Sequence, residues 1–389
     1  MTNAILDVNL ETNPKIYFST THAQDSNYYQ VARELLKNEA NDVEDLDLLV
    51  NAKVPDDCNV LVITSLKEDF TEFEKDLILE YINNGDVLCE TNKGVFLLKE
   101  VATSEKRIPA LCELYTWLYE QGEHQIDYMV ANRNGEYISS LDNGDRYMLK
   151  KWYAGHECDI KKTREILEAA GNLAKLHTVM RHELEHGITE GIKTGEKYRR
   201  HNRELKKVRQ FVRKAVPKGE FEFAFLQQFE LMYQLAEAAV CELEQSDYEQ
   251  LYQEEMNRSG MTHGEYNYHN IIMTREGIAT MNFEKFHRDI QVEDLYYFLR
   301  KVMEKSGWKL RLGDGMLNAY SAIHPLTRSE TEYLKIRLIY PEKFWKIANS
   351  YYCMNKAWIS VKNTEKLKTA IKQTEEKKMF LKELFGFEL

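Results

Sequence analysis

The chain has 389 residues, of which 43% are hydrophobic, 11% aromatic and 30% charged. This composition supplies enough apolar side chains for packed cores, which excludes a largely disordered chain, and the length suits two domains or more. The formal net charge of -11 argues against a general nucleic-acid-binding protein, since such proteins need positive charge to contact phosphates.

Cysteine usage and hydropathy indicate the compartment. The six cysteines are scattered singly, without a CxxC pair or a dense framework, which is typical of a reducing environment or of buried thiols. No apolar run approaches the roughly 18 residues of a membrane-spanning helix, and the first residues lack the basic and apolar regions of a secretory signal. We therefore expect a protein without a membrane span that is made in the cytoplasm.

Residues 1–84 alternate between predicted strands and helices. The apolar and periodic patterns predict strands at 15–19 and 59–64 and helices at 26–36 and 71–82. The second helix opens with Thr71 and Glu74 at the spacing of a capping box. We predict a small α/β module that packs as ordinary strand–helix units and binds no ligand.

Residues 85–155 follow a different pattern. A β-hairpin is predicted from strands at 87–91 and 95–99 around a turn that contains a glycine. Further along, 146–152 is a predicted strand that runs into a turn at Gly155 and would suit a hinge between two lobes. We therefore assign this part of the chain to an N-terminal lobe.

Two charged residues of this lobe are candidates for nucleotide binding. Lys99 ends the second strand of the hairpin, and Glu113 lies in the predicted helix 108–121, with Glu105 just before it as a rival. In kinases a strand lysine contacts the nucleotide phosphates and pairs with a glutamate of the following helix. No Gly-rich phosphate loop precedes Lys99, which weakens the case for a nucleotide.

A helix predicted over 162–180 carries His177 on its apolar face, where we interpret it as an interior histidine. Directly after it, His182-Glu183-Leu184-Glu185-His186 matches the HExxH pattern, in which two histidines one helical turn apart bind zinc and the glutamate acts as base. A zinc peptidase using these two histidines and Glu183 is therefore one alternative. Gly187 and Gly191 follow closely, however, and indicate that a helix ends in a loop here.

Residues 193–218 carry a concentrated positive charge. Eleven bases stand against two acids, so the segment has a net charge of +9 and the remainder of the chain -20. Such a segment is either a solvated helix face or a docking strip for an acidic partner, including the acidic surface of another copy of the chain. The apolar helix predicted next, at 221–244, belongs to a core.

The sequence His-Gly-Glu-Tyr-Asn-Tyr-His-Asn at 263–270 is followed eleven residues later by Met-Asn-Phe-Glu at 281–284. Kinase-like phosphotransferases have a His-x-Asp loop with the catalytic base, an Asn five residues later that holds a metal ion, and a metal-binding Asp before a Phe. The same spacing occurs here with two changes. Glu265 replaces the base and Asn282 replaces the metal-binding Asp, whereas Asn270 is kept.

Both replacements argue against efficient phosphoryl transfer. Glu is one methylene longer than Asp, which displaces the carboxylate by about 1 Å, enough to lower the rate on the order of 100-fold. Asn282 removes a full negative charge from a site that must hold a divalent cation, and such cations favour carboxylate oxygens. Glu284, two residues further along a predicted strand, would lie on the same face and partly compensate.

Further characteristic segments surround this motif. They are 262–272, 281–285, 289–305, 307–309, 319–320, 325–326, 340–352 and 356–358, of which 289–305 is the most specific. Together they resemble the spore coat protein CotS family, a branch of the aminoglycoside phosphotransferase and choline kinase-like fold. The resemblance runs from about residue 85 to the C-terminus. It implies an α+β, two-lobed protein-kinase-like fold, with an N-terminal lobe at 85–155, a mainly helical C-terminal lobe at 156–389, and the α/β module in front.

The resemblance also implies site residues. Carried over by position, Glu265 replaces the catalytic Asp and Asn270 keeps the metal-binding Asn. Asn282 replaces the metal-binding Asp, and Glu284 keeps the acidic residue after Phe. On the cofactor side, Lys99 and Glu113 would contact the nucleotide.

Finally, the resemblance implies a function and a place. The protein is expected to be made in the mother cell and to join the spore coat, with other coat proteins as partners through 193–218. The leading interpretation is a catalytically degenerate kinase-like coat component without a required cofactor. The alternative is an active phosphotransferase for a small molecule or a protein, which would use ATP and Mg²⁺ with Glu265 as base.

Overall fold

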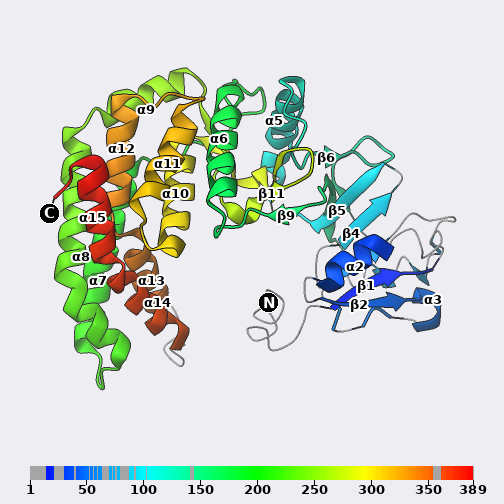
Figure 1. Cartoon of the computed structure of the whole chain (residues 1–389), viewed down its shortest axis with the longest axis horizontal. Coiled ribbons are helices and arrows are strands. Elements are labelled where there is room, and N and C mark those ends of the chain that lie inside the picture. Colours follow the sequence, from blue (N-terminus) through cyan, green and yellow to red (C-terminus); the bar gives the residue numbers. More distant parts are fainter. Residues whose placement is uncertain are drawn as a thin grey trace. The chain divides into compact units, whose positions relative to one another are not determined.

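The computed structural model describes residues 15–21, 30–38, 41–51, 53–55, 57–58, 60–63, 70–71, 73–74, 77–78, 87–91, 93–101, 103–140, 144–353 and 361–388. The chain divides into two compact units, which Figure 1 colours mainly blue to cyan and green to red. The first comprises Met1–Tyr119, His124–Gly155 and Thr274–Thr280 and holds most of the strands. The second comprises Glu120–Glu123, His156–Met273 and Met281–Leu389 and is mainly helical.

The first unit is built on one mixed sheet with the strand order β2-β1-β3-β4-β5-β8-β6, and β7 pairs with β8. Its strands are β1 (Lys15–Ser19), β2 (Asp42–Leu46), β3 (Val60–Ile63), β4 (Val87–Thr91), β5 (Gly94–Glu100), β6 (Met129–Val130), β7 (Ser139–Ser140) and β8 (Arg146–Lys151). β1, β2 and β3 are parallel, and α2 (Gln30–Asn38) and α3 (Leu48–Asn51) lie in their connections. β1, β3 and α2 agree with the elements that the sequence predicts, whereas β2 and α3 were not predicted.

The capping box predicted at the second helix of the module is confirmed. The backbone N–H of Thr71 donates to Glu74 Oε2 at 2.8 Å, and the N–H of Glu74 donates to Thr71 Oγ1 at 3.3 Å. Leu77 and Ile78 of this helix pack into an apolar cluster with buried side chains of the sheet, including Leu61. The remainder of this predicted helix, and residues 26–29 of the first, lie outside the described residues.

The module and the predicted N-terminal lobe share the sheet, because β3 and β4 pair in parallel. Parallel neighbours need a crossover connection, which here spans residues 64–86. The predicted boundary at residue 84 lies outside the described residues. β4 and β5 form the predicted antiparallel hairpin, and only Asn92 and Lys93 separate the two strands.

Beyond β5 the sheet is antiparallel, and α5 (Ile108–Glu120) follows β5 as predicted. Lys150 of β8 forms an ion pair with Asp127, with side-chain exposures of only 1% and 2%. Tyr115 of α5 donates to the same carboxylate at 2.8 Å. A buried charge is strongly unfavourable unless it is paired and hydrogen-bonded, so these three residues fix α5 against the sheet. No local pattern in the sequence points to this pair.

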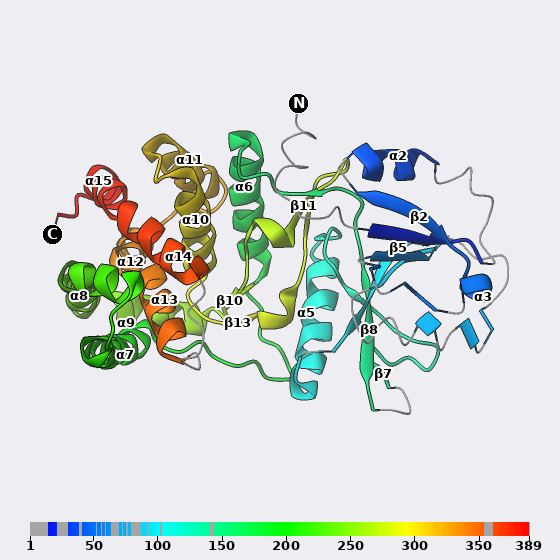
Figure 2. The same cartoon turned by 90° about the horizontal axis from the view of Figure 1, so that it is seen from below.

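The second unit consists mainly of helices, seen from a second direction in Figure 2. They are α6 (Thr163–Val179), α7 (Thr194–Lys214), α8 (Glu220–Gln245), α9 (Tyr248–Asn257), α10 (Val292–Ser306), α11 (Leu310–Ser321), α12 (Arg328–Ile339), α13 (Glu342–Cys353), α14 (Val361–Lys372) and α15 (Thr374–Phe385). The short strand β9 (His156–Glu157) precedes α6, and β10 (Met261–Thr262), β11 (Ile271–Met273) and β13 (His287–Arg288) lie between α9 and α10.

Local sequence explains where these helices run. In α7 the buried residues recur every three or four positions, at Tyr198, Asn202, Leu205, Val208 and Val212, which is the periodicity of one helix face. α10 ends at Gly307, whose φ of 70° is the left-handed conformation favoured at a helix C-terminus. Among the described residues, no helix combines the length and the apolar character needed to cross a bilayer.

Candidate functional site

The predicted base loop follows β10, which pairs antiparallel with β13. A carboxylate of α10, that of Asp294, accepts the backbone N–H of His263 at 2.6 Å and that of Gly264 at 2.9 Å. Burial favours a raised pKa for Asp294, but the hydrogen bond from His177 and the backbone N–H of His263 outweigh it, so the pKa is lowered. The loop is therefore anchored by a buried, ionised carboxylate.

The residues of this loop are matched to a tight backbone path. Gly264 has a φ of 83°, and a Cβ there would lie 2.3 Å from the carbonyl oxygen of Lys285, so only glycine fits. His263 donates from Nε2 to the carbonyl of Met281 at 2.9 Å and accepts the N–H of Glu265 at Nδ1, 3.1 Å away. These two contacts define a neutral imidazole with its proton on Nε2.

Glu265, the predicted base, is partly exposed, with 35% of its side chain accessible. Its Oε1 lies 2.5 Å from Nζ of Lys285, which comes from the turn after the second motif. A general base must meet the hydroxyl of its substrate within hydrogen-bond reach. One oxygen of the Glu265 carboxylate is instead engaged by an ammonium group of the chain itself.

Asn270 and Asn282, the two predicted amide ligands for a metal, contact each other. Nδ2 of Asn270 donates to the backbone carbonyl of Glu265 at 2.9 Å, so its Oδ1 is free to accept from another group. It accepts from Nδ2 of Asn282, also at 2.9 Å. An aspartate at position 282 could not make this contact, because an ionised carboxylate has no proton to donate. The replacement therefore removes a charge and directs a donor at a neighbouring ligand oxygen.

The strand expected through Asn282 and Glu284 is wrong. β12 (Ile278–Thr280) ends before it, Asn282 adopts the left-handed conformation with φ 65°, and Phe283–Lys285 form a short 3₁₀ turn. Asparagine and aspartate tolerate this conformation better than other residues with a Cβ. The alternation of side chains along a strand, from which Glu284 was expected to share a face with Asn282, does not apply to this turn.

Lys99 and Glu113 lie in the first unit, on β5 and α5 as predicted, and both side chains are half-buried. Lys99 stands opposite Met148 of β8 in the antiparallel ladder. The rival residue Glu105 lies before α5 and forms an ion pair with Arg146. The nucleotide contacts of Lys99 and Glu113, like the metal contacts of the second unit, stay predictions.

The zinc peptidase alternative loses its structural basis. Residues 180–193, which include His182, Glu183 and His186, contain no helix, so the two histidines are not one helical turn apart. Across the described part of the chain, no group of three or more His, Cys, Asp or Glu side chains could hold a metal ion. The chain reaches α7 through a loop here because Gly187, with a φ of 64°, and Gly191 interrupt any helix.

The histidine and aspartate that matter structurally lie elsewhere. His177 is fully buried, as expected of an interior histidine, and its Nδ1 lies 2.7 Å from the hydroxyl of Tyr320. Its Nε2 lies 3.3 Å from Asp294. Sequence reasoning placed Asp294 in the most characteristic segment of the chain but gave it no role, because its partners are far away in the sequence.

The basic segment forms α7 and carries its charges on two sides. Toward α8, Arg199 pairs with Glu244 at 2.6 Å and Arg209 with Glu230 at 3.3 Å. The other side has three exposed bases that have no ion pair among the described residues. They are spaced by four and seven positions, hence on one face of the helix. We call them the basic stripe: Arg203, Lys207 and Lys214.

The fold is that of kinase-like phosphotransferases. The structure is similar to an aminoglycoside phosphotransferase from Alicyclobacillus acidocaldarius, with a TM-score of 0.67 and 18% identity, covering 76% of this chain and 87% of that one. It is also similar to a spectinomycin phosphotransferase bound to AMP, with a TM-score of 0.53 and 10% identity, covering 79% and 92%. At these identities the similarity establishes the fold, and the predicted fold class is confirmed.

The family follows from the sequence. Residues 79–384 match the family described as spore coat putative kinase YutH, and the chain belongs to it. It is 26% identical to spore coat protein S of Bacillus subtilis over 302 residues, which cover 76% of this chain and 85% of that protein. The predicted resemblance to a spore coat family with a kinase-like fold is therefore confirmed.

Proposed function

We propose that this protein is a catalytically degenerate kinase-like component of the spore coat that acts in coat structure or assembly. The observation that carries the proposal is the hydrogen bond from Asn282 Nδ2 to Asn270 Oδ1 at 2.9 Å. In an active phosphotransferase these two positions give a carboxylate and an amide oxygen to metal ions. Here the two amides are hydrogen-bonded to each other and offer no negative charge, so the pair does not fit Mg²⁺, which prefers carboxylate ligands.

The base position supports the same conclusion. Glu265 carries the longer side chain, and its Oε1 is held by Lys285 at 2.5 Å. To act as a base, the carboxylate would have to exchange this ion pair for a substrate hydroxyl and accept its proton. Both changes lower the population of a reactive geometry.

The strands before Lys99 provide a third support. In protein kinases a Gly-rich loop before the lysine strand covers the nucleotide phosphates. β4 and β5 are joined by two residues, and β3 reaches β4 through a parallel crossover instead of a hairpin. Neither of these connections is a hairpin long enough to fold over a triphosphate.

A place in the coat is inferred from the family and from the charge of α7. The basic stripe is exposed and without ion pairs among the described residues, whereas Arg199 and Arg209 are already paired with acids of α8. The chain outside 193–218 has a net charge of -20. An acidic coat protein, or the acidic surface of a second copy, would complement the stripe.

One feature favours a second function, that of an active ATP-dependent phosphotransferase for a small molecule or a protein. The base loop keeps its buried anchor on Asp294, and Glu265 keeps an acidic group at the base position. In that function Glu265 would be the base, and Mg²⁺ and ATP would be held by the remaining residues of the motif and the N-terminal lobe: Asn270, Glu284, Lys99 and Glu113.

Turnover distinguishes the two functions. The rate of ADP formation is measured with ATP, Mg²⁺ and sugars, amino alcohols or coat proteins as acceptors. It should be far below the roughly 1 to 100 per second of typical kinases. The same rate should be found for Glu265→Ala. A rate on the order of 1 per second that Glu265→Ala abolishes would refute the proposal.

Restoring aspartate at both replaced positions tests whether these replacements are what prevents binding of ATP and Mg²⁺. The double variant Glu265→Asp with Asn282→Asp should gain Mg²⁺-dependent binding of ATP, seen as a rise in melting temperature, because a ligand of the folded state stabilises it. Aspartate at 282 is compatible with the left-handed backbone there and cannot donate to Asn270. Asn318→Asp, an exposed position of α11, introduces the same charge and should gain nothing.

A further inference from the structure

The second unit contains a cavity of about 310 Å³ beside the base loop. Thr262 of β10 and Gly264 of the base loop line one side, and the remaining walls come mainly from side chains of α7, α10, α12 and α13. The volume is at the lower end of the range of small-molecule sites, about 300 to 1,000 Å³. The cavity is therefore large enough for a small metabolite-sized ligand.

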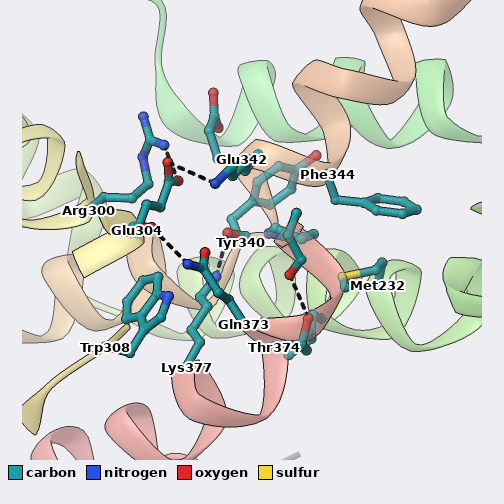
Figure 3. A pocket seen from close by; sticks show the side chains of 14 residues that line it. Met232, Arg300, Glu304, Trp308, Tyr340, Glu342, Phe344, Gln373, Thr374 and Lys377 are labelled. Carbon is teal, nitrogen blue, oxygen red and sulfur yellow. Dashed lines mark hydrogen bonds and ion pairs between the residues drawn. The ribbon is translucent and has the colours of Figure 1, made fainter. Parts of the chain in front are cut away.

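Several buried polar atoms of its walls have no hydrogen-bond partner among the described residues. They include the hydroxyl of Tyr296 and Nε of Arg300 and Arg337, in side chains that are at most 5% exposed. Nη1 of Arg300 is occupied by Glu304, in the neighbouring pocket that Figure 3 shows. Buried polar groups are nearly always hydrogen-bonded in native proteins. All three of these atoms can donate, but Nε of Arg337 already lies 2.8 Å from a carboxylate oxygen of Glu293. The unused donors are therefore the hydroxyl of Tyr296 and Nε of Arg300.

The acidic residues of the walls are already engaged. Asp294 accepts the N–H groups of the base loop, and Asp289 lies 3.5 Å from Nε2 of His287. Glu293 lies 2.8 Å from Nε of Arg337, as an ion pair whose geometry is not that of a hydrogen bond, and Glu342 lies 3.7 Å from Lys346. Oε2 of Glu342 has no hydrogen-bond partner among the described residues. Five Lys and Arg side chains line the cavity against four carboxylates, so its walls carry a net positive charge.

Burial alone would raise the pKa of the Glu342 carboxylate, but the positive charges of Lys197 and Arg337 lower it to about 2. Lys197 therefore lies in the electrostatic field of this carboxylate. It projects from α7 into the cavity, is half-buried, and has neither an ion pair nor a side-chain hydrogen bond among the described residues. The positive charge of Arg337 and then burial lower its pKa, which reports a positive local potential. Arg200, one turn further along α7, also lines the cavity and has only a long contact of 3.9 Å with Glu204.

We propose that this cavity binds a small anion through a phosphate or carboxylate group, with Lys197 as the principal contact and Arg200 and Tyr296 as further donors. Charge-assisted hydrogen bonds from an ammonium and a guanidinium group are the usual means of holding such groups. A cationic ligand would meet the same donors and be disfavoured. The inference goes beyond the proposed function, because a coat protein without phosphoryl transfer can still retain a ligand site.

Isothermal titration of the full chain at physiological ionic strength tests the proposal, with inorganic phosphate, succinate and choline as probes. Phosphate or succinate should bind, and choline should not. Lys197→Met keeps the length of the side chain and removes its charge, and it should weaken anion binding about ten- to a hundredfold. Lys175→Met makes the same charge change at an exposed position of α6 and should leave the affinity unchanged.

The melting temperature separates loss of the site from loss of the fold. Lys197 has no ion pair among the described residues, and its attraction to Glu342 is opposed by its repulsion from Arg337, so Lys197→Met without ligand should melt close to the melting temperature of the wild type. Whichever of phosphate and succinate binds more tightly identifies the recognised group. The proposal is overturned if neither anion binds, if Lys197→Met binds them as tightly as the wild type, or if choline binds more tightly than both.

Discussion

The buried ammonium group of Lys377 predicts an unusual alkaline stabilisation. Lys377 lies in α15, and its Nζ donates to the carbonyl of Tyr340 at 3.1 Å, with the carbonyl of Ile339 at 3.5 Å (Figure 3). The Lys377 side chain is half-buried and lines the pocket shown in Figure 3. Burial lowers the pKa of Lys377 from 10.5 to about 7, because the charged form loses its hydration.

The direction in which stability changes with pH follows from proton binding to Lys377 in the folded and unfolded states. In the unfolded chain Lys377 stays protonated up to a pH near its ordinary pKa of 10.5, whereas in the folded protein it loses its proton above about 7. Between these values the unfolded state binds more protons, so the free energy of unfolding rises with pH. A shift of this size corresponds to about 5 kcal/mol at most. Below pH 7 both states are charged, and the folded state bears the full cost of burial.

The perturbation is Lys377→Met, which keeps the apolar stem. At pH 7 the variant should be more stable than the wild type, since the lost hydrogen bonds contribute only about 1 kcal/mol. The free energy of unfolding, measured by urea unfolding followed by circular dichroism, should rise between pH 7 and pH 10. The rise in the wild type should exceed that in the variant by about 3 kcal/mol.

A neighbouring lysine provides the control. Lys378 makes only a surface ion pair with Glu375 at 3.6 Å, and Lys378→Met should respond to pH as the wild type does. Other groups titrate equally in all three proteins, so the difference isolates Lys377. An identical pH response of the wild type and Lys377→Met would refute the reasoning.

Three further predictions concern the base loop and the basic stripe. In a thermal melt, Gly264→Ala should lower the free energy of unfolding by about 2 kcal/mol or more, because the new Cβ would clash with the carbonyl oxygen of Lys285. Gly135 has the same φ of 83° but nothing within 4 Å of such a Cβ, so Gly135→Ala should cost only about 1 kcal/mol. Asp294→Asn should lower the free energy of unfolding by about 3 kcal/mol. The lowered pKa of Asp294 gives stability that is present above about pH 4 and lost as the pH falls further, so the variant should lose less stability than the wild type below pH 4. An equal loss of stability below pH 4 in both proteins would contradict this. Reversing the basic stripe to Glu should leave the melt intact and reduce incorporation into the spore coat or self-association, most at low ionic strength; normal incorporation would make the stripe a solvated face.

The sequence by itself determined the local elements and the class of protein. The hairpin of β4 and β5, the capping box at Thr71 and the basic helix α7 are all specified by residues close together in the chain. Turn residues, caps and apolar periodicity act over a few positions, so they can be recognised without a fold. The spacing from Glu265 to Asn270 and on to Asn282 likewise indicated a kinase-like site with two replacements.

Only the tertiary structure decided what those residues contact. Asn282 donates to Asn270 across twelve positions, and Asp294 holds a loop that lies thirty positions before it. The expected strand through Glu284 failed because packing places Asn282 in the left-handed conformation, which no periodicity reports. Hydrogen bonds and ion pairs depend on distance and direction in space, and these are set when helices and loops far apart in the sequence pack together.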